Sequence, residues 1–499
     1  MAEIYGKINP LCQGAQAPLR RGAGSMLFTS NIFLFLFLPV TIAGYFLLHK
    51  PYRNTFLLLM SLGFYAWGEP KFVFVLTGSI LFNYACAMGV HYTSKHAVLR
   101  KALLILCIAA NLGLLFIYKY LDFAVTNINR FGLSLSLRNL LLPIGISFFT
   151  FQAISYVVDV YRGDVAVQKR PHLVGLYIAF FPQLVAGPIV RYKDIEAQLV
   201  TRTITFDQFS EGIKRFLVGF IKKVLLANNL ALIADAAFSL PAGERSVVYA
   251  WLGAIAYSLQ ILFDFAGYSD MAIGLGKMFG FTFLENFNYP YISKSISEFW
   301  RRWHISLGQW FRDYVYFPLG GSRVKAKARL VFNLLVVWLM TGIWHGASWN
   351  FVAWGLLYFV LIALEKVTGY PDKFKSAAAK AAYRVFTLLC VLLGWVLFRA
   401  EGGNAALQYG LSMLGLAGNS LTCDSTILTL REYWPFLLFG LLCSTELFKH
   451  IGAHLAASAK PVLRIAYNTG TVALYAFGFL WAVSFLILGA HNPFIYFNF

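Results

Sequence analysis

Long apolar runs recur along the whole of this 499-residue chain and constrain its fold more than any other feature. The first, residues 27–48, reads LFTSNIFLFLFLPVTIAGYFLL and contains no charged residue. About 20 mostly apolar residues cross the hydrocarbon core of a bilayer as a helix. Only 13% of the residues are charged, against about a quarter in soluble proteins. The pattern predicts an all-α polytopic membrane protein and excludes a soluble or disordered chain.

Eleven to thirteen membrane spans are predicted from these runs. After residues 27–48, the apolar runs fall at approximately 54–68, 72–92, 101–119, 141–161, 172–190, 208–238, 246–275, 328–346, 348–366, 383–399, 433–449 and 463–490. Proline and glycine interrupt the stretch FFPQLVAGP (residues 180–188). Such broken backbone is tolerated at membrane depth only where protein or a water-filled cavity covers it.

One membrane domain, residues 26–499, is expected because no linker divides the apolar runs and no fixed-period repeat is present. Residues 1–25 are polar and carry the pair Arg20–Arg21, which also fits the basic end of a signal peptide. The apolar run that follows is too long for a signal peptide and lacks a small-residue cleavage site. We therefore expect a retained first span, preceded by a leader that is disordered or non-native, with Met26 as the natural start.

The formal net charge of +20 does not indicate a nucleic-acid-binding protein, because the positive residues lie in short segments between the apolar runs. A nucleic-acid-binding protein shows one basic domain or face, whereas the cytoplasmic loops of membrane proteins collect Lys and Arg. Lys50 and Arg53 follow the first span, and by this rule they place the preceding end of the chain outside. If Arg20 and Arg21 are counted as well, the bias nearly cancels.

Residues 291–329 differ from the apolar runs around them. They hold three tryptophans, two acidic residues (Glu298 and Asp313) and eight basic ones: Lys294, Arg301, Arg302, Arg312, Arg323, Lys325, Lys327 and Arg329. The first part is predicted to be an amphipathic helix that is too charged to span unaided. It would lie in the membrane interface or enter the bundle as a re-entrant element. The end, GGSRVKAKAR, is predicted to be a cytoplasmic loop.

Several motifs of soluble enzymes are absent from the sequence. It has no GxxxxGK[ST], HExxH, GxSxG or His-x4-Asp pattern. His450 and His454 are four residues apart, but no carboxylate or cysteine completes a metal site, and no metal is expected. The six cysteines are scattered without a CxxC pair, so they predict neither a disulfide framework nor a metal site.

Two histidines lie at or near apolar runs, where ionisable residues are costly and usually functional. His345 stands in MTGIWHGASWNF and His304 in FWRRWHISLGQWF. A neutral imidazole can take a proton from a hydroxyl that attacks an acyl group, and exclusion of water protects an acyl thioester from hydrolysis. The alternative is a His345 that merely ends a helix. Gly342 and Gly346 weigh against it, because they permit close approach of another chain or a ligand.

Asp264 and Tyr268 belong to a third polar island, LQILFDFAGYSDMAIG. They are four residues apart and therefore share a helix face. Asp270 is six residues from Asp264, which is about 240° around a helix, so the two carboxylates do not form an acid/base pair on one face. Asp264 is expected to orient a neighbour or to pair with an arginine.

A family resemblance is carried by five segments, which occur in this order: LLPIGISFFTFQAISYVVDVYRG, FFPQLVAGPIVRY, FDFAGYSDMAIGLGKMFGF, NFNYPYISKSISEFWRRWHISLGQWFRDYVYFPLGGSR and LMTGIWHGASWNFVAWGLLY. Together they resemble the membrane-bound O-acyltransferase (MBOAT) superfamily. Within it they resemble the branch of the alginate O-acetyltransferase membrane subunit and related bacterial polysaccharide and peptidoglycan O-acetyltransferases. FWRRWHISL followed by WHG is the specific signal. The opening LFTSNIFLFLFLPV and the ending NPFIYFNF also fit, so the resemblance covers residues 26–499.

The resemblance implies a ring of transmembrane and re-entrant helices around a central tunnel, in the cytoplasmic (inner) membrane of a bacterium. It implies transfer of acetyl from cytosolic acetyl-CoA across the membrane toward an exported polysaccharide or cell-wall glycan, with an extracytoplasmic SGNH-type transferase as partner. The family's invariant histidine falls on His345 and its second active-site position on His304. The terminal FIYF-like motif implies that the phenol of Tyr496 relays the acyl group, with an interfacial aromatic anchor as the alternative.

The candidate substrate- and donor-binding set has eight members: Arg301, Arg302, Trp300, Trp303, Asp264, Tyr268, Arg323 and Lys325. The phosphates of acetyl-CoA would be attracted by the basic loop, although the same loop also serves to set topology. The two adjacent arginines would line the donor path or anchor the interface. The two tryptophans would wall the tunnel or simply pack at membrane depth.

Two other functions stay open at this stage. The same fold could load a different acyl group, such as D-alanine, from a carrier protein that docks beside the tunnel. A proton-coupled transporter would instead use His345 and Asp264 as relays and would show solute flux without any thioester. An inverted repeat would favour the transporter, and none is visible in the sequence.

Overall fold

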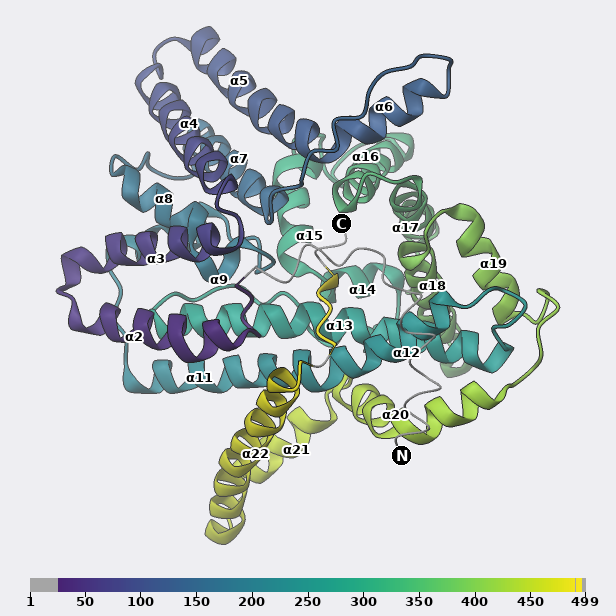
Figure 1. Ribbon diagram of the computed structural model, residues 1–499. Helices are drawn as coiled ribbons and strands as arrows, with labels where there is room; N and C mark the ends of the chain where they lie inside the picture. Colours follow the sequence, from purple (N-terminus) through teal and green to yellow (C-terminus); the bar gives the residue numbers. More distant parts are fainter. Residues whose placement is uncertain (1–25, 490, 496–499) are drawn as a thin grey trace.

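Helices account for the regular structure of the computed structural model, which describes residues 26–489 and 491–495 (Figure 1). No β-strand occurs within these ranges, which confirms the all-α prediction. The expectations for the leader, residues 1–25, and for the phenol of Tyr496 lie outside the described residues.

The helices fall into three consecutive groups along the chain. The first contains the π-helical turn η1 (Phe33–Phe37), α2 (Leu38–Leu47), the 3-10 turn η2 (Lys50–Tyr52), α3 (Arg53–Gly68), α4 (Phe72–Tyr92), α5 (Ala97–Leu115), the π-helical turn η3 (Phe116–Tyr120), α6 (Leu121–Asn129), α7 (Ile146–Arg162), α8 (Pro171–Ala179), α9 (Phe181–Leu184) and α10 (Tyr192–Val200). The second contains α11 (Phe206–Ile221), the π-helical turn η4 (Lys222–Ala227), α12 (Asn228–Ser239), α13 (Val247–Met278), the 3-10 turn η5 (Pro290–Ile292), α14 (Ile296–Arg302), α15 (Ile305–Phe311) and the π-helical turn η6 (Arg312–Tyr316). The third contains α16 (Lys327–His345), α17 (Trp349–Thr368), α18 (Ala377–Arg399), α19 (Gly403–Met413), α20 (Asp424–Cys443), α21 (Leu447–Ala456) and α22 (Pro461–Ile487).

Nine helices in the described ranges are long and apolar enough to cross a membrane. They are Phe72–Tyr92, Ala97–Asn129, Phe206–Ser239, Val247–Met278, Lys327–His345, Trp349–Thr368, Ala377–Arg399, Asp424–Cys443 and Pro461–Ile487. The sequence predicts eleven to thirteen spans because it also counts the apolar runs of η1 and α2, of α3, of α7 and of α8, which form shorter helices. Of these, α7 and α8 are largely buried, whereas α2 and α3 keep exposed apolar residues such as Leu47 and Leu59.

The longest helix, α13, runs across the middle of the molecule and packs against α11 and α12 (Figure 1). Paired glycines allow this close contact. A Cβ on Gly274 would lie 2.6 Å from the carbonyl oxygen of Gly212, and a Cβ on Gly267 would lie 2.8 Å from that of Gly219. Without a hydrophobic driving force between helices in lipid, small residues at the crossing let the backbones gain van der Waals contact. This crossing fixes one wall of the site described below.

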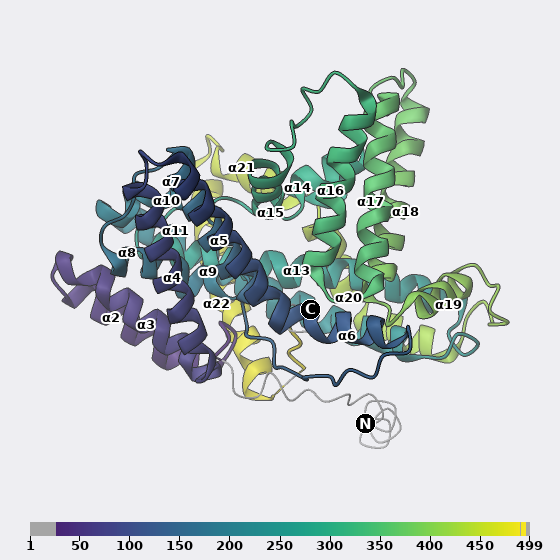
Figure 2. The same ribbon diagram turned by 90° about the horizontal axis from the view of Figure 1, so that it is seen from above.

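The antiparallel helices α16, α17 and α18 stand side by side and form a second wall (Figure 2). Serine side chains accept a hydrogen bond from the first turns of α17 and α18, so each helix begins at an N-cap that satisfies a backbone donor. After α22 the chain turns back, and its last described residues cross α13 as the yellow trace in Figure 1. The C-terminal segment, residues 491–495, therefore lies between the two walls.

Candidate active site

His304 stands at a sharp break between α14 and α15. Its backbone is left-handed, with φ 48° and ψ 51°, a conformation that costs free energy for residues other than glycine. The amphipathic helix predicted for the start of residues 291–329 is thus two short helices, because the backbone leaves the helical conformation at Trp303 and His304. His304 is 2% exposed, so the break lies inside the protein.

Asn286 holds this break in place. Its carbonyl oxygen accepts a hydrogen bond from Ile305 N at 2.9 Å, and its side-chain oxygen accepts one from Ser306 Oγ at 2.9 Å. The Asn286 amide in turn donates to Ser269 Oγ on α13 at 3.1 Å. Ser306 Oγ also accepts from Ile189 N, which ties the broken segment near residues 180–188 to the same point. Buried protein contacts cover that segment, as its sequence predicts.

His345 is the last residue of α16, and the backbone of Gly346 is extended. Added side-chain atoms at Gly342 and Gly346 would collide with Phe351, so the predicted close approach of another segment is confirmed, with α17 as that segment. The last carbonyls of a helix lack partners within the helix. Here Lys119 Nζ donates to the carbonyl oxygens of Trp344 (2.6 Å) and His345 (3.3 Å).

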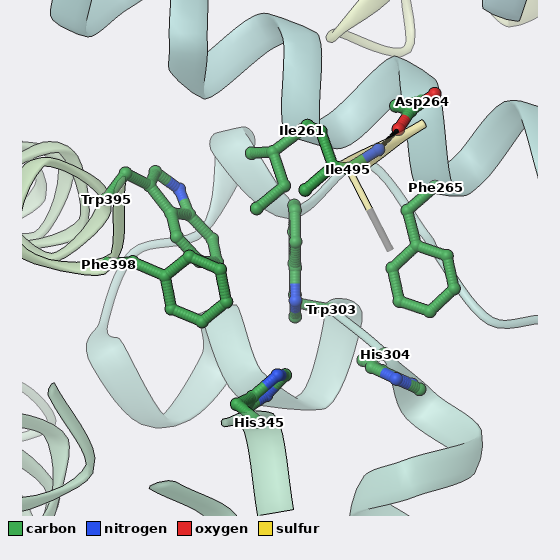
Figure 3. Close-up of a pocket in the computed structure, with 9 residues that line it drawn as sticks. All are labelled: Ile261, Asp264, Phe265, Trp303, His304, His345, Trp395, Phe398 and Ile495. Carbon is green, nitrogen blue, oxygen red and sulfur yellow. Dashed lines mark hydrogen bonds between the residues drawn. The ribbon is translucent and has the colours of Figure 1, made fainter. Parts of the chain in front are cut away.

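The two histidines line one pocket, which Figure 3 shows in close-up. Its walls are formed by Ile261, Asp264, Phe265, Trp303, His304, His345, Trp395, Phe398 and Ile495. The His345 ring lies against Trp354 and Phe398, with ring centroids 5.0 and 5.2 Å away. The His304 ring meets Phe265 edge to face at 4.6 Å. The two imidazoles thus lie near one another at one end of the pocket, whose other walls are largely aromatic (Figure 3).

Burial controls the protonation of His304, which lies outside the nine spanning helices. Because the surrounding rings provide little solvation for a cation, the pKa of His304 falls to about 3. The imidazole is therefore neutral at pH 7 and has one N–H to donate and one nitrogen to accept. Such a group suits acyl transfer, in which a proton moves and negative charge develops on a carbonyl oxygen.

Asp264 pairs with a lysine, whereas the sequence favours an arginine. Its Oδ1 lies 2.6 Å from Lys223 Nζ, and both side chains are almost fully buried. Its Oδ2 accepts a hydrogen bond from Ile495 N at 2.9 Å, drawn as the dashed line in Figure 3. The same carboxylate therefore contacts a buried cation and the main chain of the C-terminal segment. Ile495 itself forms part of the pocket wall.

The other sequence-predicted residues lie around this pocket. Trp303 lines it, while Trp300 packs one layer behind, against Trp338 and Trp354. The Tyr268 ring stacks on Phe28.

The predicted basic residues stay at the periphery. Arg302 pairs with Glu298 at 2.9 Å, and Arg301 is exposed. Arg323 and Lys325 are exposed in the loop that precedes α16.

Sequence reasoning missed several residues that shape the site. Lys119, Lys223 and Glu365 all lie in apolar helices, and that position is itself the signal, since ionisable residues at membrane depth are usually functional. Lys119 and Lys223 also project from the π-helical turns η3 and η4, and such turns are frequent at functional sites. Asn286 has no comparable signal, because a lone asparagine in a polar loop is common.

Residues 91–370 match the family described as MBOAT, membrane-bound O-acyltransferase family. They make up more than half of the chain and contain both pocket histidines. The chain belongs to this family. It is therefore a multi-pass membrane O-acyltransferase, and the pocket is the candidate site of that chemistry.

Three relatives illustrate the range of this O-acyltransferase family. A protein of Pseudomonas putida named "Probable alginate O-acetylase AlgI" is 45% identical over 77% of this chain and 80% of its own length. The peptidoglycan O-acetyltransferase of Helicobacter pylori is 34% identical over 95% of this chain and 98% of its own. The teichoic acid D-alanyltransferase of Bacillus subtilis is 33% identical over 45% of this chain and 59% of its own.

Replacing Lys119 by methionine is expected to lower the kcat of this O-acyltransferase about tenfold, with little change in the KM for the acyl donor. Lys119 donates hydrogen bonds to the carbonyl end of α16 and so fixes the position of the His345 ring in the pocket. Lys119→Arg, which keeps the charge, should restore part of the rate. Tyr120→Phe is the matched control, since it removes only the neighbouring bond to Ile343 O (2.9 Å). Equal kcat values for Lys119→Met and the wild type would exclude this positioning role.

Proposed function

We propose that this enzyme transfers an acetyl group from acetyl-CoA to the phenol of Tyr496, and from there to an extracytoplasmic acceptor. The observation that carries the proposal is the place of the C-terminal segment. Ile495 lines the same pocket as His345 and His304, and Tyr496 is the next residue in the chain. The proposal therefore assigns the relay to the residue that follows a pocket-wall residue in the chain.

The reaction needs a base, and His345 supplies it. Among the hydrogen bonds of the described residues, those at His345 engage its backbone carbonyl and none engages its ring. The imidazole accepts the phenol proton while the phenol oxygen bonds to the thioester carbonyl carbon. The carbon–sulfur bond then breaks, and the thiolate of CoA takes the proton from the imidazolium. His304, neutral at pH 7, donates an N–H to the carbonyl oxygen as negative charge develops there.

Charge at the helix ends supports a cytoplasmic entry for the donor. The start of α16, the end of α17 and the start of α18 lie at the same end of this antiparallel group (Figure 2). The connections there carry Arg323, Lys325, Lys373 and Lys375. By the positive-inside rule this end faces the cytoplasm, and its cations attract the phosphates of CoA. His345 lies at the opposite end of α16, where an acyl group would be handed outward.

The acetyl group would leave Tyr496 through a partner outside the cytoplasmic membrane of a bacterium. We propose an SGNH-type transferase, whose hydroxyl attacks the tyrosyl ester and returns a proton to the phenol. The final acceptor would be an exported polysaccharide or a cell-wall glycan. The names of the relatives from P. putida and H. pylori, which refer to alginate and peptidoglycan, support this class of acceptor.

Tyr496→Phe is expected to abolish acetylation of the C-terminal peptide while leaving a folded protein, because only one hydroxyl is removed. The enzyme is purified in nanodiscs and supplied with radiolabelled acetyl-CoA. The label is then located by mass spectrometry of the C-terminal peptide. Tyr467→Phe, which removes a hydroxyl from α22, serves as control. Label that persists on the C-terminal peptide of Tyr496→Phe, or wild-type label found only elsewhere, would contradict the relay.

An acyl-carrier protein is the second candidate donor. We consider it because the chain also matches a teichoic acid D-alanyltransferase. That match covers 45% of this chain, whereas the two O-acetylation relatives cover 77% and 95%, so acetyl-CoA is the first choice. Parallel reactions with acetyl-CoA and with a carrier-linked D-alanyl thioester separate the two. Label transferred only from the carrier would replace acetyl-CoA as the donor and leave the roles of the pocket residues unchanged.

A further inference from the structure

We propose that the buried Lys223–Asp264 ion pair is a clamp that seats the C-terminal segment, residues 491–495, so that the next residue is presented to the two histidines. The role of the clamp in acyl transfer rests on the proposed function. The clamp itself is argued only from contacts among described residues. Lys223 and Asp264 are positioning residues in this scheme, because they hold the main chain near the pocket and do not touch the reacting atoms.

Both charges of the pair bind main-chain atoms of the segment. Asp264 Oδ2 accepts the Ile495 N–H at 2.9 Å, and Lys223 Nζ donates to the carbonyl oxygen of Pro493. The two charges themselves lie 2.6 Å apart. The ion pair thus binds the main chain of this stretch at two points, the carbonyl oxygen of Pro493 and the N–H of Ile495. Because an unpaired backbone group buried in an apolar site is costly, the pair supplies bonds that the segment needs in order to enter the pocket.

Further side chains continue this contact toward α22. Asn492 accepts a hydrogen bond from Asn228 at 3.1 Å and donates one to Thr29 at 3.1 Å. His491 Nε2 lies 3.1 Å from Asp235 Oδ2. Lys223 Nζ also donates to Asn228 Oδ1 at 2.8 Å, which links these contacts to the ion pair. Hydrogen bonds from side chains of the bundle therefore hold the C-terminal segment at residues 491, 492, 493 and 495 as it approaches the pocket.

Helix packing alone does not explain the Lys223–Asp264 pair. A second buried carboxylate on α13, Asp270, already ties that helix to Arg215 and Lys222, each at 2.7 Å. The glycine crossing of α11 and α13 adds close backbone contact. A buried ion pair carries a large desolvation cost and is often replaceable by apolar residues. Its presence here is accounted for by what it binds, the main chain of the C-terminal segment.

The adjacent ion pair offers a matched control for a direct test. The double variant Lys223→Met/Asp264→Asn removes both charges together, so that neither is left buried and unpaired. The control Lys222→Met/Asp270→Asn removes the same two residue types from the same two elements without touching the segment. Both variants and the wild type are purified in nanodiscs, and hydrogen–deuterium exchange of the C-terminal peptide is followed by mass spectrometry. Exchange should be faster only in the first variant, because Pro493 O loses its lysine donor and Ile495 N faces a neutral amide oxygen in place of a carboxylate.

Acetyl transfer provides the second readout. The acetyl found on the C-terminal peptide is divided by the CoA released, which corrects for enzyme that merely hydrolyses the donor. This ratio should fall about tenfold or more in Lys223→Met/Asp264→Asn, because hydrogen bonds to charged groups are lost. It should stay at the wild-type value in the control. If the first double variant does not purify as a monodisperse protein, Asn492→Ala tests the same seating from the other end of the segment.

Each outcome bears on a separate statement. Equal exchange in all three proteins would overturn the clamp. Faster exchange with an unchanged acetyl ratio would overturn its role in presenting the next residue. If the wild type carries no acetyl on the C-terminal peptide but exchange still separates the variants as expected, the clamp stands and the relay through Tyr496 fails.

Discussion

Replacing His345 by alanine is expected to lower the rate of CoA release from acetyl-CoA by about 10²- to 10⁴-fold, the usual contribution of a positioned general base. The loss should appear in kcat, because the imidazole acts in the transition state and does not bind the CoA phosphates. The fold should survive the substitution. His345 touches its neighbours through ring contacts with Trp354 and Phe398, and the bonds that cap α16 use its backbone carbonyl.

The measurement is the release of free thiol from acetyl-CoA by the purified enzyme in nanodiscs. His304→Ala is expected to lose about 10²-fold, since it removes one donor to the developing oxyanion but leaves the base in place. His91→Ala, an exposed histidine near the end of α4, is the control and should match the wild type. A His345→Ala protein that retains most of the wild-type rate would show that another group accepts the proton.

Short sequence patterns singled out the two histidines as candidate site residues, and the family resemblance suggested their roles. His345 lies in WHG and His304 in FWRRWH, and each pattern combines an ionisable residue with aromatic neighbours at or beside an apolar run. The structure brings both side chains to one pocket. The break at His304 is not visible in such a pattern, because residues 296–302 and 305–311 both favour a helix. The left-handed backbone is held by Asn286, a residue from a preceding loop.

Long-range contacts account for what the sequence could not predict. Lys119 and Trp344 are 225 residues apart, and Asp264 and Ile495 are 231 apart. Periodicity within one helix carries no information about such pairs. The sequence therefore identified Asp264 as a residue with a charged partner but favoured an arginine, although α11 and η4 contain three lysines, Lys214, Lys222 and Lys223. Which lysine reaches the carboxylate depends on how α11 crosses α13.

Glu365→Ala is expected to cause a large loss of stability, about 3 kcal/mol or more, because it leaves three hydrogen-bond donors without their acceptor. Glu365 projects from α17 and is 5% exposed. Its two oxygens accept the backbone N–H groups of Ile296 and Ser297, each at 2.8 Å, and the hydroxyl of Tyr383 at 2.9 Å. A carboxylate at the first turn of α14 also interacts favourably with the positive end of the helix dipole.

The temperature of unfolding of the purified protein measures this effect, with Glu446→Ala as control. Glu446 pairs with Lys449 near the surface at 3.2 Å, and such exposed pairs contribute little. Glu365→Gln should be intermediate, because one amide oxygen remains to accept while the amide nitrogen faces a backbone donor. Since α14 leads directly into Trp303 and His304, CoA release should fall together with stability. Glu365→Ala that unfolds at the same temperature as Glu446→Ala would mean that other contacts hold α14. Activity lost in Glu365→Gln at an unchanged unfolding temperature would instead assign the carboxylate to the geometry of the pocket.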